Sequence, residues 1–103
     1  MHSLIAEHRA KIADVCRRYR VRRLEVFGSA ARGDDFEPDR SDVDFLVEFE
    51  EDDEGTSLKE FFELRDELSE LVGRPVDLVM LTSVRNPYVR SDIERSRELL
   101  YAA

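Results

Sequence analysis

Several features are scarce in this chain of 103 residues, and each scarcity excludes a class of protein. Cys16 is the only cysteine, so no disulfide can form within the chain. No apolar run approaches the roughly 20 residues that a membrane-spanning helix needs. The first residues become charged too early for a secretory signal. These absences predict a cytoplasmic protein with no membrane contact.

The sequence does contain enough apolar residues for one modest core. Hydrophobic residues make up 42% of the chain and charged residues 39%. Domains usually run to about 100–200 residues, so residues 1–103 are expected to form a single small domain. A chain of this length leaves no room for a separate domain that holds a substrate.

Acidic residues outnumber basic ones, but they are unevenly placed. The net charge is −8, with +5 over residues 1–33 and −13 over residues 34–103. Residues 34–54 alone hold twelve acidic residues and one basic residue. Duplex binders usually need a broad basic face, so the charge argues against nucleic-acid binding. The acidic stretch is typical of a solvated loop, a metal site or a dock for a basic partner.

Hydrophobic periodicity and turn residues predict alternating helices and strands, and hence an α/β fold with a mixed sheet flanked by helices. Ser57 and Glu60 have the spacing of a helix capping box, and Asn86-Pro87 has the pattern of a helix start. The expected elements are a helix over 4–19, a strand over 24–27, a helical turn over 29–32, a turn over 34–40, a strand over 43–49, an acidic connector over 50–55, a helix from 57 to 73, a strand over 76–81, a helix over 86–96 and an edge strand over 98–101.

Four further expectations concern the helices and the N-terminus. The basic cluster 17–23 is interpreted as cations at the end of the first helix, with a contact to a partner or to RNA as the alternative. His2 is expected at a mobile terminus, and Cys16 in the core. The helix after the capping box is expected to bury Leu58, Phe61, Phe62, Leu68, Leu71 and Val72.

The aspartates of the second strand predict a metal site. Residues i and i+2 of a strand project from the same face, so Asp42 and Asp44 are forced together. At ~5 Å and an effective dielectric of ~20, their repulsion is about 3 kcal/mol. A divalent cation removes that cost, and Mg²⁺ prefers one or two carboxylates together with phosphate oxygens and water.

Asp77 and the Gly28-Ser29 pair extend this prediction to a phosphate-transfer site. Asp77 is flanked by Val76, Leu78 and Val79, so we expect a buried carboxylate there. If the strand holding Asp77 lies beside the strand over 43–49, Asp77 completes a three-carboxylate cluster able to hold two metal ions. Gly28 would allow close backbone approach, and Ser29 with the following amides would supply donors for a polyphosphate. Each motif alone is a weak signal, whereas the ordered combination on consecutive strands is restrictive.

The segments 28–33 and 41–47 read Gly-Ser-Ala-Ala-Arg-Gly and Ser-Asp-Val-Asp-Phe-Leu-Val. They resemble the motifs of the minimal nucleotidyltransferases, which belong to the DNA polymerase β superfamily. Twelve residues separate Ser29 from Asp42 here, a slightly longer loop than the family pattern has. We expect the aspartates to be unaffected, because strand register fixes them. The resemblance covers nearly the whole chain and implies the nucleotidyltransferase fold.

The resemblance also implies catalytic roles for the three aspartates. Asp42 and Asp44 would be metal ligands. Asp77 would be a third ligand or the base that deprotonates the acceptor hydroxyl. The cofactor would be Mg²⁺, with two ions expected.

The nucleotide-binding residues implied by the resemblance are Gly28 and Ser29, which would hold the β- and γ-phosphates of ATP, with Arg32 assisting. Family members of this size are typically antitoxins encoded with a HEPN ribonuclease toxin, and they add AMP to a tyrosine of that toxin. The resemblance therefore implies a protein adenylyltransferase that forms a hetero-oligomer with a HEPN toxin.

Three other functions stay open at this point. The chain could be a non-catalytic antitoxin that neutralises by binding, although the presence of all three aspartates argues against it. It could be a small-molecule nucleotidyltransferase acting as a homodimer, which its length disfavours. A nucleic-acid polymerase fits poorly with the net charge of −8.

Overall fold

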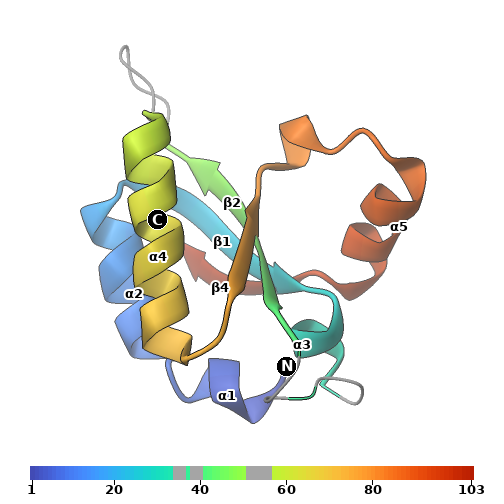
Figure 1. Ribbon diagram of the computed structural model, residues 1–103, viewed down its shortest axis with the longest axis horizontal. Coiled ribbons are helices and arrows are strands. Elements are labelled where there is room, and N and C mark those ends of the chain that lie inside the picture. The colour runs from blue at the N-terminus through green and yellow to red at the C-terminus, as the bar shows by residue number, and fades with distance from the viewer. Residues whose placement is uncertain (34–36, 38–40, 51–56) are drawn as a thin grey trace.

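A four-stranded sheet lies between two groups of helices in the computed structural model (Figure 1). The structure describes residues 1–33, 37, 41–50 and 57–103. In chain order the elements are α1 (Ser3–Ala6), α2 (Arg9–Arg18), β1 (Val21–Phe27), α3 (Ser29–Arg32), β2 (Val43–Phe49), α4 (Leu58–Val72), β3 (Val76–Val79), the 3₁₀ helix η1 (Leu81–Ser83), α5 (Pro87–Ser96) and β4 (Glu98–Ala102).

The strand order in the sheet is β3-β2-β1-β4. β1 runs antiparallel to both β2 and β4, whereas β2 and β3 are parallel because α4 crosses over between them. The mixed sheet flanked by helices confirms the predicted α/β fold. It also places β2 and β3 side by side, which is the arrangement that the prediction for Asp77 requires.

The two faces of the sheet are covered differently. α2 and α4 lie side by side on one face (Figure 1) and build the main apolar core with it. α5 covers part of the opposite face. The smaller apolar cluster on that face consists of Phe27, Leu46 and Ile93. Because side chains alternate along a strand, Asp44 and Glu48 share the α5 face with Leu46.

The predicted helix over residues 4–19 is split into α1 and α2. The His8 ring Nδ1 donates to the Leu4 carbonyl at 2.8 Å, the acceptor that the His8 amide would use in a continuous helix. The His8 amide donates to Ile5 instead, at 3.1 Å. His2, expected to be mobile, is held, because its amide donates to Ala30 at 2.7 Å.

The basic cluster 17–23 does not simply end the first helix. α2 ends at Arg18, and Arg22 and Arg23 already belong to β1, which starts earlier than predicted. Both are paired within the chain, Arg22 with Glu48 at 3.8 Å and Arg23 with Glu25 at 3.0 Å. Part of the cluster therefore belongs to a strand rather than to a helix end.

α4 confirms the capping box, since the Glu60 amide donates to the Ser57 hydroxyl at 3.2 Å. The prediction of burial is wrong for two residues of this helix, since Leu58 is 74% exposed and Phe62 is 44% exposed. The buried stripe runs instead through Leu64, Leu68 and Val72. At about 100° per residue, Leu58 and Phe62 fall to one side of that stripe.

The C-terminal elements largely agree with the prediction. α5 begins at the predicted proline, and Asn86 caps it by accepting the Tyr88 amide at 2.9 Å. The third strand ends at Val79, and its last predicted residues turn into η1. The predicted turn over 34–40, apart from Glu37, and most of the connector over 50–55 lie outside the described residues. Within the described residues, no helix combines the length and apolar character needed to cross a membrane.

Candidate active site

The parallel pairing of β2 and β3 brings two of the predicted aspartates together. Asp44 is the register partner of Asp77, so both side chains project from the α5 face of the sheet. Asp42 directly precedes β2 and is exposed. Asp77 is also exposed, which corrects the expectation of a buried carboxylate. The reason is that β3 is an edge strand with a neighbour on one side only.

The Gly28 corner lies directly against Asp44. β1 ends at Phe27, the register partner of Asp44, and the chain turns at Gly28 with φ +72°. A Cβ atom on Gly28 would lie 2.6 Å from Asp44 Oδ2, closer than real Cβ contacts. Only glycine fits both this conformation and this space. The Asp-x-Asp motif and the Gly-Ser motif are therefore in contact, although twelve residues separate Ser29 from Asp42.

Gly28 also starts the short helix α3. Its carbonyl accepts the amides of Ala31 and Arg32, each at 3.1 Å. The first N–H groups of a helix have no acceptors within that helix, so the amide of Ser29 can donate to an anion, whereas Ala30 is fully buried. Ser29 is the first helical residue, and its side chain is partly exposed.

Asp44 sits in an environment that opposes its negative charge. The pKa of Asp44 is raised from 3.8 to about 6, mainly by burial and also by the charges of Asp77, Asp42 and Asp92, while Arg32 lowers it. A half-buried carboxylate surrounded by other carboxylates is typical of a site that binds a cation.

The donor chemistry of these aspartates fits Mg²⁺. Within the part of the chain that the structure describes, no three histidine, cysteine or acidic side chains are gathered into a preformed metal cage. Mg²⁺ does not require one, because it is usually bound by one or two carboxylates together with phosphate oxygens and waters. Asp42 and Asp44 are the residues that could hold it, with Asp77 beside them.

Arg32, predicted to assist with the nucleotide, is paired within the protein. Its Nη1 donates to Asp92 Oδ1 of α5 at 3.0 Å, and both side chains are 41% exposed. Arg32 also lowers the pKa of Asp44, so its charge acts on the candidate site. Asp92 is a fourth carboxylate there, and the sequence analysis missed it.

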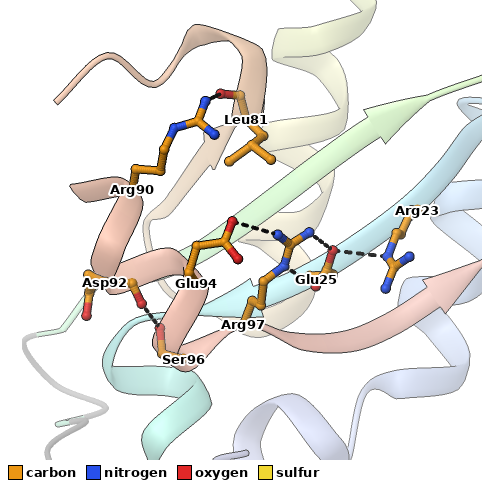
Figure 2. Close-up of polar contacts among 8 residues, drawn as sticks. All are labelled: Arg23, Glu25, Leu81, Arg90, Asp92, Glu94, Ser96 and Arg97. Carbon is orange, nitrogen blue, oxygen red and sulfur yellow. Dashed lines mark hydrogen bonds and ion pairs between the residues drawn. The ribbon is translucent and has the colours of Figure 1, made fainter. Parts of the chain in front are cut away.

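Ser96 is a second residue of α5 that sequence reasoning missed. Its hydroxyl accepts the Gly28 amide at 2.9 Å and donates to the Asp92 carbonyl at 2.7 Å. Figure 2 shows the second of these bonds. Asp92 and Ser96 are four residues apart on one helix, but no local signal in the sequence indicates that this part of α5 reaches the Gly28 corner.

α5 is fixed to the sheet by a buried ion pair next to the site (Figure 2). Glu25 of β1 is 4% exposed and accepts two hydrogen bonds from Arg97, at 2.6 and 2.8 Å. These hydrogen bonds lower the pKa of the Glu25 carboxyl below its usual value of 4.5. Arg23 adds a third contact at 3.0 Å. The carboxylate is therefore fully paired, as a buried charge requires.

Comparisons with known proteins agree with this fold. The model of the nucleotidyltransferase domain family matches residues 9–100. A relative from Methanocaldococcus jannaschii, provisionally named as a protein adenylyltransferase, is 43% identical over 84 residues, or 82% of this chain and 79% of the relative. The protein adenylyltransferase MntA of Thermococcus cleftensis is 38% identical over 101 residues, or 98% of this chain and 91% of the relative.

Solved structures share the same fold. One, provisionally described as a minimal nucleotidyltransferase, has a TM-score of 0.73 at 33% identity and covers 95% of both chains. A toxin–antitoxin complex solved with AMP-PNP has a TM-score of 0.69 at 22% identity, covering 92% of this chain and 73% of that chain. At that identity the second likeness concerns the fold alone.

The sheet, the Gly-Ser corner and the facing aspartates define a nucleotidyltransferase. The chain belongs to the nucleotidyltransferase domain family, and within it to the minimal nucleotidyltransferases. It is therefore an enzyme of the class that transfers nucleotidyl groups.

Proposed function

We propose that this protein is a protein adenylyltransferase that moves AMP from ATP to a hydroxyl group, a tyrosine in the simplest case, of a HEPN toxin and thereby acts as its antitoxin. The observation that carries the proposal is the register of Asp44 against Asp77 beside Gly28. This arrangement puts two carboxylates and a corner without a side chain on one face of the sheet. Such a site suits a metal-bound polyphosphate.

The relatives support both the donor and the acceptor. MntA of Thermococcus cleftensis is named as a protein adenylyltransferase. A toxin–antitoxin complex with this fold was solved with AMP-PNP, an analogue of ATP. Another contains a tri-AMPylated HEPN toxin from Shewanella oneidensis with its MNT antitoxin, at a TM-score of 0.66 and 19% identity.

The proposed reaction is an in-line displacement at the α-phosphorus of ATP. The acceptor oxygen forms a bond to that phosphorus while the bond to the oxygen bridging the α- and β-phosphates breaks. The electron pair of the broken bond leaves with pyrophosphate. The hydroxyl proton passes to a carboxylate, and Asp77 is the candidate because it is exposed on the site face beside Asp44.

The remaining residues bind the nucleotide. Asp42 and Asp44 would hold Mg²⁺, which when bound neutralises phosphate charge and stabilises the attacking and leaving oxygens. The Ser29 hydroxyl and amide donate to the β- and γ-phosphates. Arg32 adds positive charge from the other end of α3.

The partner must bring its hydroxyl to the α-phosphate, so we propose a hetero-oligomer of this chain with the toxin. ATP is abundant inside cells, which suits the cytoplasmic location predicted from the sequence.

The test is the intact mass of the partner after incubation with ATP and Mg²⁺. Wild-type protein is expected to add one or more increments of about 329 Da, each one AMP group. Asp44→Asn should abolish the increment. Glu48→Gln is the matched control, because Glu48 is an acid on the same strand and the same face. Unmodified partner with the wild-type protein would contradict the proposal.

Two further measurements separate the alternatives. If the double variant Asp42→Asn/Asp44→Asn still protects cells from the toxin, binding alone neutralises it. If the purified chain modifies an aminoglycoside without any partner, the homodimeric small-molecule enzyme is supported instead. We expect neither result.

A further inference from the structure

The Gly28 corner needs a fixed backbone direction, but glycine does not restrain its own backbone. The position requires glycine, since a Cβ would lie 2.6 Å from Asp44 Oδ2 and φ is +72°. Yet glycine has the least restrained backbone of all residues. A corner that presents phosphate donors in one fixed direction therefore needs a restraint from another part of the fold.

Ser96 supplies such a restraint from the last turn of α5. The Gly28 N–H donates to the Ser96 hydroxyl oxygen at 2.9 Å, across 68 residues of sequence. The hydroxyl hydrogen is used as well, because it donates to the Asp92 carbonyl at 2.7 Å. With both partners defined, the hydroxyl has one orientation, and the peptide plane between Phe27 and Gly28 is fixed with it.

The other end of α3 is tied to the same helix. Arg32 closes α3 and pairs with the Asp92 side chain at 3.0 Å. α5 in turn is fixed to β1 through Arg97, which binds the buried carboxylate of Glu25 (Figure 2). Both ends of α3 are thus attached to α5, which is itself fixed to the sheet.

We propose that Ser96 is a positioning residue for nucleotide binding. By occupying the Gly28 N–H, its hydroxyl orients the corner so that the Ser29 hydroxyl and amide face the phosphates. The Gly28 N–H is then not itself a phosphate donor. The inference rests on the proposed function, because it assigns ATP to this corner.

The first part of the test needs no activity. Amide hydrogen exchange at Gly28, followed by NMR in the nucleotide-free protein, is expected to be about five- to tenfold faster in Ser96→Ala, the effect of losing one hydrogen bond. Ser96→Thr keeps the hydroxyl and should restore slow exchange. Ser91→Ala is the matched control, because Ser91 is an exposed serine of the same helix. Unchanged exchange in Ser96→Ala would overturn the proposal.

The second part measures AMP transfer at varied ATP. Ser96→Ala should raise the KM for ATP about fivefold with kcat within about twofold, because a contact that helps hold the phosphates acts on substrate and transition state alike. Ser96→Thr and Ser91→Ala should behave as wild type. A general loss of fold would lower kcat through the active fraction and leave KM unchanged. An unchanged KM in Ser96→Ala would overturn the positioning role.

The two proposals fail in different ways. If the wild-type protein transfers no AMP while Gly28 exchange responds to Ser96→Ala, the proposed function is wrong and the positioning role falls with it, although the hydrogen bond stands. If the wild-type protein is active and Ser96→Ala has wild-type kinetics, only the inference about Ser96 is wrong.

Discussion

Asp44 is the residue at which function and stability conflict most clearly. Its pKa of about 6 lies above the ordinary value of 3.8, so ionisation costs more in the folded protein than in the unfolded chain. The protonated form therefore stabilises the fold at acidic pH, and that stability is lost as the pH rises through about 6. At neutral pH and without metal, Asp44 destabilises the protein.

We predict that Asp44→Asn stabilises the metal-free protein while abolishing transfer. After allowance for the partial exposure of Asp44, the gain should be about 1–2 kcal/mol above pH 6 and should vanish as the pH falls toward 4. Urea unfolding of both proteins across this pH range measures it. Glu48→Gln is the control without such a gain, and a loss of stability in Asp44→Asn at pH 8 would contradict the assignment.

Gly28 offers a second test, with Gly73 as its matched control. Both glycines have a positive φ, +72° and +71°, but a Cβ on Gly73 would meet nothing within 4 Å. Gly73→Ala should cost about 1 kcal/mol from backbone strain alone. Gly28→Ala should cost more, because the Cβ also displaces the Asp44 carboxylate, and it should abolish transfer. Thermal melts and transfer assays measure both effects, and an active Gly28→Ala would contradict the close approach.

For single residues, the sequence was informative where neighbouring residues alone determine the role of a side chain. Asp42, Asp44 and Gly28 stand out because a strand forces two charges together and a corner needs glycine. The sequence identified Asp77 as a candidate, but it did not predict that Asp77 is exposed. The position of β3 at the edge depends on the order of strands in the whole sheet. Ser96 and Asp92 could not be found, because nothing in a helical serine four residues after an aspartate indicates what it will meet 68 residues away.

The attachment of α5 to β1 depends on the pair of Glu25 and Arg97. The pKa of Glu25 is lowered mainly by its hydrogen bonds to Arg97, so this carboxylate stabilises the fold above pH 4.5 and loses that contribution as the pH falls through its lowered pKa. Its side chain is 5% exposed, whereas Glu94, which pairs with the same arginine at 3.2 Å, is 55% exposed.

We predict that Glu25→Gln lowers the free energy of unfolding by about 2 kcal/mol at pH 7 and by much less at pH 3, because it leaves a partly buried Arg97 without its main partner. Glu94→Gln should cost less than about 0.5 kcal/mol at either pH, as exposed pairs usually do. Urea midpoints at the two pH values measure both variants. Equal losses in the two variants would contradict the distinction.

The elements that the sequence predicted well are those with local start and stop signals. The Ser57 capping box and Asn86-Pro87 each mark a helix start correctly. The errors occur where tertiary contacts override periodicity: the His8 ring replaces a backbone bond between α1 and α2. Likewise, the third strand gives way to η1 after Val79.

In the molecule as a whole, the candidate site exists only because four elements meet. β1 ends at the Gly28 corner, β2 and β3 align their aspartates, and α5 covers the remaining side. The order of strands could be inferred only conditionally from the sequence, since it depends on whether β3 lies beside β2. The register of Asp44 against Asp77 shows that it does.

The most direct test of this assembled site is transfer of radiolabel from ATP to the proposed HEPN partner, purified, in the presence of Mg²⁺. Label in the α-phosphate should appear on the partner with the wild-type protein and with Glu48→Gln, and label in the γ-phosphate should not. Asp44→Asn and Asp77→Asn should each lower α-label transfer at least about a hundredfold. Transfer of α-label by Asp44→Asn at the wild-type rate would contradict the account.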